Sequence, residues 1–177
     1  MKNLYLELAE LLATITEIKW IDLWHNQVNF IEDEHEFPTP AVFLSFRALN
    51  ADDMAQNIQN LELQVEVYLY FETFADTYKD SVNQESALAF LDILNKIYIK
   101  LQGTEGTNYQ NMRRIGFNAV DTGGAGNLYQ TVFNCTSTDF SAQKTYLEAE
   151  TDELNIINEI LEPEITITGL ESMFERN

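Results

Sequence analysis

The residues with the clearest potential for chemistry form a short acidic and glycine-rich segment in the second half of the chain. Asp121 is followed by Thr122 and then by Gly123, Gly124 and Gly126. A carboxylate that lies beside a second carboxylate can share a proton with it and activate a water molecule, because two close carboxylates cannot both ionise cheaply. Asp121 is therefore a candidate acid/base residue.

Two interpretations of Asp121 are open at this point. The segment 119–123 resembles the catalytic signature of aspartic proteases, in which two small apolar residues precede Asp-Thr-Gly. The same residue types are favoured in turns for conformational reasons alone, and residues 121–127 separate two stretches of strand-like composition. We favour a projecting hairpin tip, because Ile167-Thr168-Gly169 is a poor substitute for the apolar-apolar-Gly element of such proteases.

Other reactive side chains do not form a recognisable constellation. His25, His35 and the acidic run 32–36 have neither the ligand spacing of a zinc site nor the glycine-turned carboxylate loop of a calcium site, so a solvated loop explains them better. Cys135 falls within a predicted strand and is expected to be a buried small hydrophobe. We expect no metal, no cofactor and no enzymatic activity.

Hydrophobic periodicity predicts the elements that would position these residues. Apolar residues recur at helical spacing near the N-terminus and again before Gly103, whereas apolar and polar residues alternate strictly over 61–71. Prolines at 38 and 40 predict an extended loop. The expected elements are a helix over 4–15, a second helix that is capped at Ser81 or Asn83 and ends at Gly103, and strands over 18–28, 41–46, 61–71, 113–120 and 128–139, with a second loop over 48–59. The second helix is expected to bury one face, formed by Ala87, Phe90, Leu91, Leu94, Ile97, Tyr98 and Leu101.

This order predicts an α+β fold with a mixed, largely antiparallel sheet. The sheet is flanked by an N-terminal helix and one main covering helix. Residues 1–143 form the expected single domain, and 144–177 form an extended acidic C-terminal arm with nine acidic and two basic residues. Within the arm, 152–161 has the pattern of a short helix and 164–168 alternates like an edge strand.

The charge balance excludes several classes of protein. The 177 residues include 29 acidic and 10 basic side chains, which gives a formal net charge of −19. Nucleic-acid binding depends on Lys and Arg displacing counterions from phosphates, and an anionic membrane surface attracts basic residues in the same way. The charge balance therefore excludes a protein that binds nucleic acid through its phosphates and one that binds an anionic membrane surface. The N-terminus has too few positive charges for a signal peptide, and the apolar runs are short, so we expect a cytoplasmic protein without a membrane span.

Aromatic residues on the less apolar face of the sheet are the candidate interface, because large rigid rings are common interface anchors. Packing in the core is the alternative for the same residues. Apolar residues of the arm's alternating segment join the candidates, since such a segment can lie on a neighbouring subunit. The candidate interface residues are Trp20, Trp24, Tyr68, Tyr70, Phe74, Ile165 and Ile167.

The element order, together with 37–46 (Phe-Pro-Thr-Pro-Ala-Val-Phe-Leu-Ser-Phe), resembles the tail terminator or tail-completion proteins of long-tailed bacteriophages, the minor tail protein U-like group. The resemblance covers about residues 1–140. It implies a small subunit of a hexameric neck ring that caps the tail tube and joins it to the head connector in the virion, after assembly in the host cytoplasm. It implies no catalytic residues.

An acidic ring through which DNA passes should repel the phosphates, so we expect DNA to pass nearby without specific binding. Two loops are candidates to line such a lumen or to contact the next ring, and their residues are Glu32, Asp33, Glu34, Glu36, Asp121 and Asn127. The rival from another class is an acidic inhibitor, an immunity or DNA-mimic protein that would present paired rows of carboxylates as a monomer or dimer. An aspartic-type protease is the third hypothesis.

Overall fold

The computed structural model describes residues 1–30, 37–71, 76–122 and 126–144. The chain divides into the units Met1–Lys144 and Thr145–Asn177. Apart from Lys144, the predicted arm lies outside the described residues, together with its predicted helix 152–161 and alternating segment 164–168. The elements in order are α1 (Lys2–Ala13), β1 (Trp20–Leu23), the 3-10 helix η1 (Gln27–Phe30), β2 (Ala41–Asp53), the 3-10 helix η2 (Ala55–Asn57), β3 (Gln59–Phe71), α2 (Gln84–Leu101), β4 (Gln110–Val120) and β5 (Asn127–Asp139).

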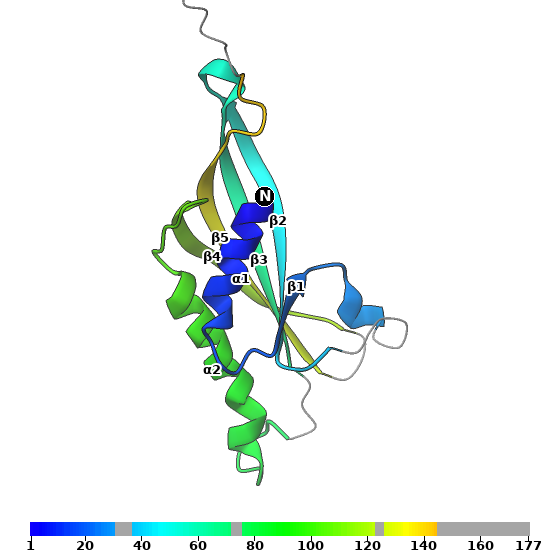
Figure 1. Ribbon diagram of the computed structural model, residues 1–177. Helices are drawn as coiled ribbons and strands as arrows, with labels where there is room; N and C mark the ends of the chain where they lie inside the picture. Colours follow the sequence, from blue (N-terminus) through cyan, green and yellow to red (C-terminus); the bar gives the residue numbers. More distant parts are fainter. Residues whose placement is uncertain (31–36, 72–75, 123–125, 145–177) are drawn as a thin grey trace, which may run out of the picture. The chain divides into compact units, whose positions relative to one another are not determined.

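The strands form one five-stranded sheet in the order β1-β2-β3-β5-β4 (Figure 1). β1 pairs parallel with β2, and the other three pairings are antiparallel. This arrangement confirms the predicted α+β fold with a mixed, largely antiparallel sheet, an N-terminal helix and one main covering helix.

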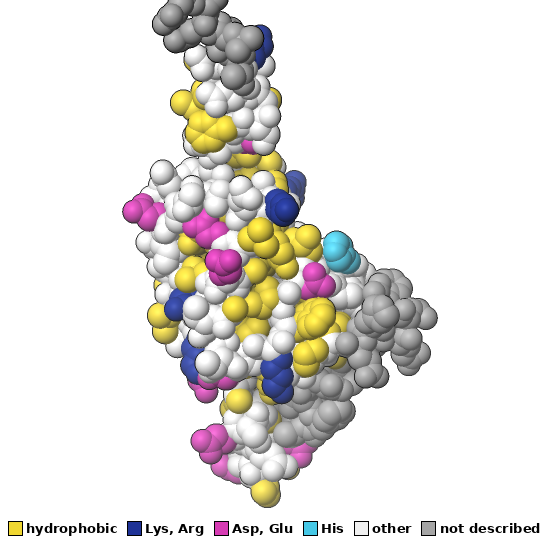
Figure 2. Space-filling view, in the orientation of Figure 1, with side chains coloured by type: hydrophobic (Ala, Val, Ile, Leu, Met, Phe, Trp, Pro, Cys, Tyr) yellow, Lys and Arg dark blue, Asp and Glu magenta, His cyan; other side chains and the backbone are white. Residues whose placement is uncertain are grey.

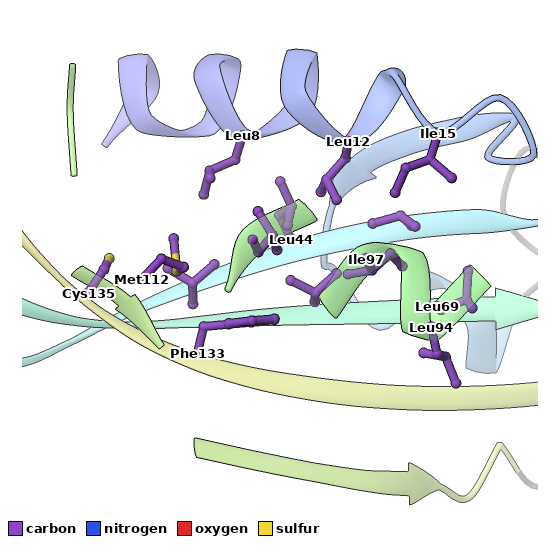
Figure 3. Packing of buried hydrophobic residues seen from close by; sticks show 14 of the residues in the cluster. Leu8, Leu12, Ile15, Leu44, Leu69, Leu94, Ile97, Met112, Phe133 and Cys135 are labelled. Atoms are coloured by element: carbon purple, nitrogen blue, oxygen red, sulfur yellow. The ribbon is translucent and has the colours of Figure 1, made fainter. Parts of the chain in front are cut away.

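Both helices pack on the same face of the sheet and enclose the main core (Figures 1 and 3). The alternating apolar residues of β3 point to this face, since Leu63, Val65, Val67 and Leu69 are all buried within the cluster. Figure 3 shows side chains of α1 pointing down onto the sheet while those of α2 reach the same layer. The core residues named in the figure are Leu8, Leu12, Ile15, Leu44, Leu69, Leu94, Ile97, Met112, Phe133 and Cys135.

The helix predicted before Gly103 is present as α2, but its predicted buried face was partly wrong. Leu91 was assigned to the core but is exposed, whereas Ile93 is buried. The stripe of α2 that meets the sheet therefore passes Ala87, Phe90, Ile93, Leu94 and Ile97 and continues to Leu101. Gly103 follows the helix at φ 73°, the left-handed conformation expected of a glycine there.

One strand prediction and one loop prediction need correction. The strand predicted over 18–28 is only four residues long, because the chain turns at Asn26 (φ 65°) into η1. The predicted loop over 48–59 is instead the end of β2, the tip η2 and the start of β3. Residues 48–53 are exposed and lack a hydrophobic pattern, so their strand conformation rests on main-chain pairing with β3 from Ala48↔Leu63 to Asp53↔Gln59.

Candidate functional site

The predicted aromatic surface is largely a second core on the sheet face opposite the helices. Tyr68 and Tyr70 are buried, so their assignment as exposed interface residues is wrong. Phe37 covers Tyr70 and its neighbour Phe43, packing edge-on against Phe43 at 5.1 Å and against Tyr70 at 5.8 Å between ring centroids. Sequence alternation placed the tyrosines on the correct face but carried no information about this cover.

Trp24 belongs to the same cluster. Its ring stacks on Tyr68 with centroids 4.2 Å apart and 9° between the planes, and it meets Phe43 edge-on at 5.8 Å. Trp24 is half-buried, whereas Trp20, the first residue of β1, is 40% exposed. Of the seven predicted interface residues, Trp20 remains clearly on the surface, and Phe74, Ile165 and Ile167 lie outside the described residues.

Of the two loops predicted to line a lumen or contact the next ring, the structure describes residues of the second only. Glu32, Asp33, Glu34 and Glu36 all lie outside the described residues. The hairpin between β4 and β5 is present: Asp121 is exposed directly after β4, and Asn127 opens β5 opposite Phe71.

A hydrogen-bonded polar network lies beside the second core on the face without helices. Glu66 accepts hydrogen bonds from Gln64 Nε2 at 2.7 Å and from the Tyr68 hydroxyl at 2.9 Å, and that hydroxyl accepts one from Gln130 Nε2 at 2.8 Å. Burial, together with the bond to the Glu66 carboxylate, raises the pKa of Tyr68 to about 12. The carboxylate of Glu66 is thus held on the sheet surface by hydrogen bonds from Gln64 and Tyr68.

The thiol of Cys135 and the possible metal ligands do not form a reactive site among the described residues. Cys135 is buried in the main core, and burial raises the pKa of its thiol to about 11, which keeps it in the unreactive protonated form at neutral pH. Within the described ranges, no group of three or more His, Cys, Asp or Glu side chains has the arrangement of a metal site.

One edge of the sheet is left open because β1 is short. β1 covers only residues 41–44 of β2, and the last main-chain bond runs from Trp24 N–H to the Leu44 carbonyl at 2.9 Å. From Ser45 to Asp53 the outer side of β2 has no main-chain partner among the described residues. A row of unpaired backbone groups of this length is a template for another strand.

A groove flanks the start of this free edge. It measures about 450 Å³ and lies between the first turn of α1, the end of β1 and the first half of β2. Its walls are mainly apolar, including Tyr5, Leu23 and Phe46, with His25 at its border. Figure 2 shows hydrophobic side chains gathered on the face that carries α1, with acidic and basic side chains scattered around them.

The opposite edge of the sheet is β4, and it is covered only at its beginning. The Arg114 N–H donates to Gln102 Oε1 at 2.9 Å, and Met112 exchanges main-chain bonds with Gly103 and Thr104. Beyond Arg114, no main-chain partner lies on the outer side of β4 within the described residues. Ile115 and Phe117 are 56% and 49% exposed on this strand.

Charge distinguishes the two edges. β4 carries Arg113 and Arg114 and no acidic residue, so it is the one net-positive strand of the described sheet. The free part of β2 ends on Asp52 and Asp53. Sequence reasoning missed both edges, although two adjacent arginines in a chain of net charge −19 were a detectable signal.

Comparisons with known proteins add no relative. Neither the scan against protein-family models nor the search of curated proteins found a match for this chain. No helix in the described ranges combines the length and the apolar character needed to cross a membrane.

Proposed function

We propose that this protein is a structural subunit of the neck of a long-tailed bacteriophage. In this role it acts as a tail terminator or related joining protein that assembles into a ring, hexameric in the resembled family. The ring caps the tail tube, joins it to the head connector and becomes part of the virion.

The observation that carries this proposal is the pair of open sheet edges. On one side of the sheet the part of β2 beyond β1 is open and ends on two aspartates, and on the other side β4 is open and carries two arginines. The sheet therefore has two different surfaces through which identical copies can associate. Exposed apolar side chains on both edges, Leu49 on β2 and Phe117 on β4, add area that is buried on association.

The element order that resembles the tail terminator group is also consistent with the architecture described above. The Pro-punctuated segment leads directly into β2, and β3, α2 and the β4–β5 hairpin follow in the expected order. A subunit with net charge −19 suits a channel through which DNA moves, because the ring repels phosphates and does not hold them.

The acidic-inhibitor alternative has less support. A mimic of DNA needs rows of carboxylates on one face, but the uncovered sheet face interleaves Glu62 and Glu66 with Arg47 and Arg113. Both oxygens of Glu66 accept hydrogen bonds from neighbouring side chains. A surface of alternating sign fits association between copies better than it fits a basic nuclease cleft.

The test is the mass of the protein in solution over a range of ionic strengths, with negative-stain images of any assembly. A ring-sized oligomer that binds the end of tail tubes polymerised from the same phage's tube protein supports the proposal. A monomer at every salt concentration, with no binding to tubes, contradicts it.

A further inference from the structure

The two free edges have compatible directions. β2 runs antiparallel to β3, β3 to β5 and β5 to β4, so β2 and β4 of one subunit also point in opposite directions. A second copy that continues the sheet in the same sense therefore places its β2 antiparallel to β4 of the first copy. Resting on the proposed ring function, we infer that β4 of one copy pairs with Ser45–Asp53 of a second copy.

The position of β1 limits the register. Because β1 already occupies the edge of residues 41–44, the incoming β4 can pair with β2 only from Ser45 onward. With the end of β4 at that point, Val120 lies opposite Ser45 and Phe117 opposite Ala48. In the subunit's own sheet, Val120 and Ser45 belong to one face and Phe117 and Ala48 to the other, so the pairing keeps each face continuous.

Both strands carry one extra residue at the same stage of this alignment. The register of β2 shifts between Ala48 and Asn50, which leaves Leu49 as the bulge, and that of β4 shifts between Arg114 and Gly116, which leaves Ile115. Gly116 faces Asn50 between the two bulges, and beyond the second bulge the strands are back in step, because each has skipped one residue. Leu49 and Ile115, 43% and 56% exposed in the single subunit, flank this pair on opposite strands.

This register then brings opposite charges together. Arg113 falls opposite Asp52 on the same face, and Arg114 lies diagonal to Asp53 on the other face. Main-chain pairing ends near Gly116, because Gln102 occupies the N–H of Arg114, and the contact continues through side chains. Directly opposite side chains have Cβ atoms about 5 Å apart, within reach of an Arg–Asp pair.

The contact joins two different surfaces and is therefore heterologous. Such contacts repeat from copy to copy and close into a ring when the rotation between subunits allows it. Within one subunit, Gln110 of β4 lies on the same line across the sheet as Asn50 of β2, through Thr136 and Glu62. In the proposed contact Gly116 of β4 faces Asn50, so the second copy is shifted along the strand direction. Stagger is the normal consequence of closing a sheet of tilted strands into a ring.

The first test reverses one charge on each edge. Arg113→Glu and Asp52→Lys should each weaken self-association by about tenfold or more, since like charges then face one another. Mixing the two variants restores complementary pairs at every junction, so equimolar mixtures should regain the wild-type mass by light scattering. Lys79→Glu and Asp92→Lys, exposed positions away from both edges, are the matched controls and should leave the mass unchanged.

The second test fixes the register by a disulfide. Asn118 lies opposite Arg47 in the proposed alignment and at the far edge of the sheet from it within one subunit. A mixture of Asn118→Cys and Arg47→Cys should therefore give a cross-linked heterodimer on a non-reducing gel, whereas Asn118→Cys mixed with Asn95→Cys should not.

The outcomes separate this contact from the proposed function. If the wild-type protein forms rings that persist in both charge variants and the cysteine pair does not cross-link, this contact is wrong while the ring function stands. If the arm or an unrelated protein occupies the free edge of β2, only the Asp52→Lys variant changes in mass, and mixing it with Arg113→Glu does not restore the wild-type mass. That result also overturns the proposed contact. A wild-type monomer under all conditions removes the function itself.

Discussion

Glu7 offers a sharp test of how the loop before β4 is held. Its carboxylate accepts hydrogen bonds from the Thr107 N–H at 2.6 Å, the Asn108 N–H at 2.9 Å and the Asn108 side-chain amide at 2.7 Å. One side chain of α1 thus fastens the segment that leads from α2 into the edge strand. Replacing it with Gln keeps the size of the side chain but removes the charge and one acceptor.

The expected loss follows from the bond count and the exposure. A hydrogen bond to a charged group contributes about 1.5–3 kcal/mol when it is shielded, and much less where water competes. The Glu7 carboxylate is near the surface, so we expect Glu7→Gln to lower the free energy of unfolding by about 1–2 kcal/mol at pH 7. For a chain of this size this is a fall in Tm of roughly 2–4 °C per kcal/mol.

The stabilisation that Glu7 provides should depend on pH, because the pKa of its carboxyl is shifted in the folded protein. Partial burial raises the pKa of Glu7, but the bonds from the Asn108 side chain and from the Thr107 and Asn108 N–H groups outweigh it, so the pKa is lowered overall. A lowered folded-state pKa means that ionisation stabilises the fold above the unfolded-state value and that this stabilisation is lost as the pH falls through the folded-state value. The difference between wild type and Glu7→Gln should therefore be full at pH 7 and shrink as the pH falls through the lowered folded-state pKa of Glu7.

The assay is urea unfolding followed by circular dichroism at a series of pH values, with Glu10→Gln as the control. Glu10 lies exposed on the same helix and makes no side-chain hydrogen bond within the described residues. An equal loss in both variants, or a Glu7→Gln effect that does not depend on pH, would refute the proposed anchoring.

Three further predictions concern packing and reactivity. Phe133→Ala removes a fully buried ring beneath both helices and should cost about 3–5 kcal/mol in urea unfolding; a loss under 1 kcal/mol would mean that the core is not closed there. Gly106→Ala places a Cβ 2.0 Å from Glu7 Oε1 and 2.8 Å from the Tyr109 ring, so it should destabilise the protein, and less so in a Glu7→Ala background; an additive double-mutant cycle speaks against the contact. The Cys135 thiol, buried and with its pKa raised to about 11, should not react with a thiol reagent at pH 8 until denaturant is added, and rapid labelling of the folded protein would disprove its burial.

Local patterns determined those parts of the fold in which the pattern and the buried surface coincide. The alternation over 61–71 predicted β3 because every second residue packs under the helices, and the apolar stripe before Gly103 predicted α2 for the same reason. Residues 48–53 carried no such pattern, because their strand is held by main-chain bonds to β3. Main-chain bonds do not depend on side-chain type, so the sequence of such a strand does not reveal its pairing.

The candidate site divides in the same way. Composition alone determined the acidity of the protein, and alternation placed Tyr68 and Tyr70 on the less apolar face of the sheet. Only the tertiary structure decided that Phe37 and Trp24 bury that face and that Arg113 and Asp52 stand on the two open edges of the sheet. Burial and edge position depend on which segments, distant in sequence, come to lie beside each strand, and that is a property of the folded chain as a whole.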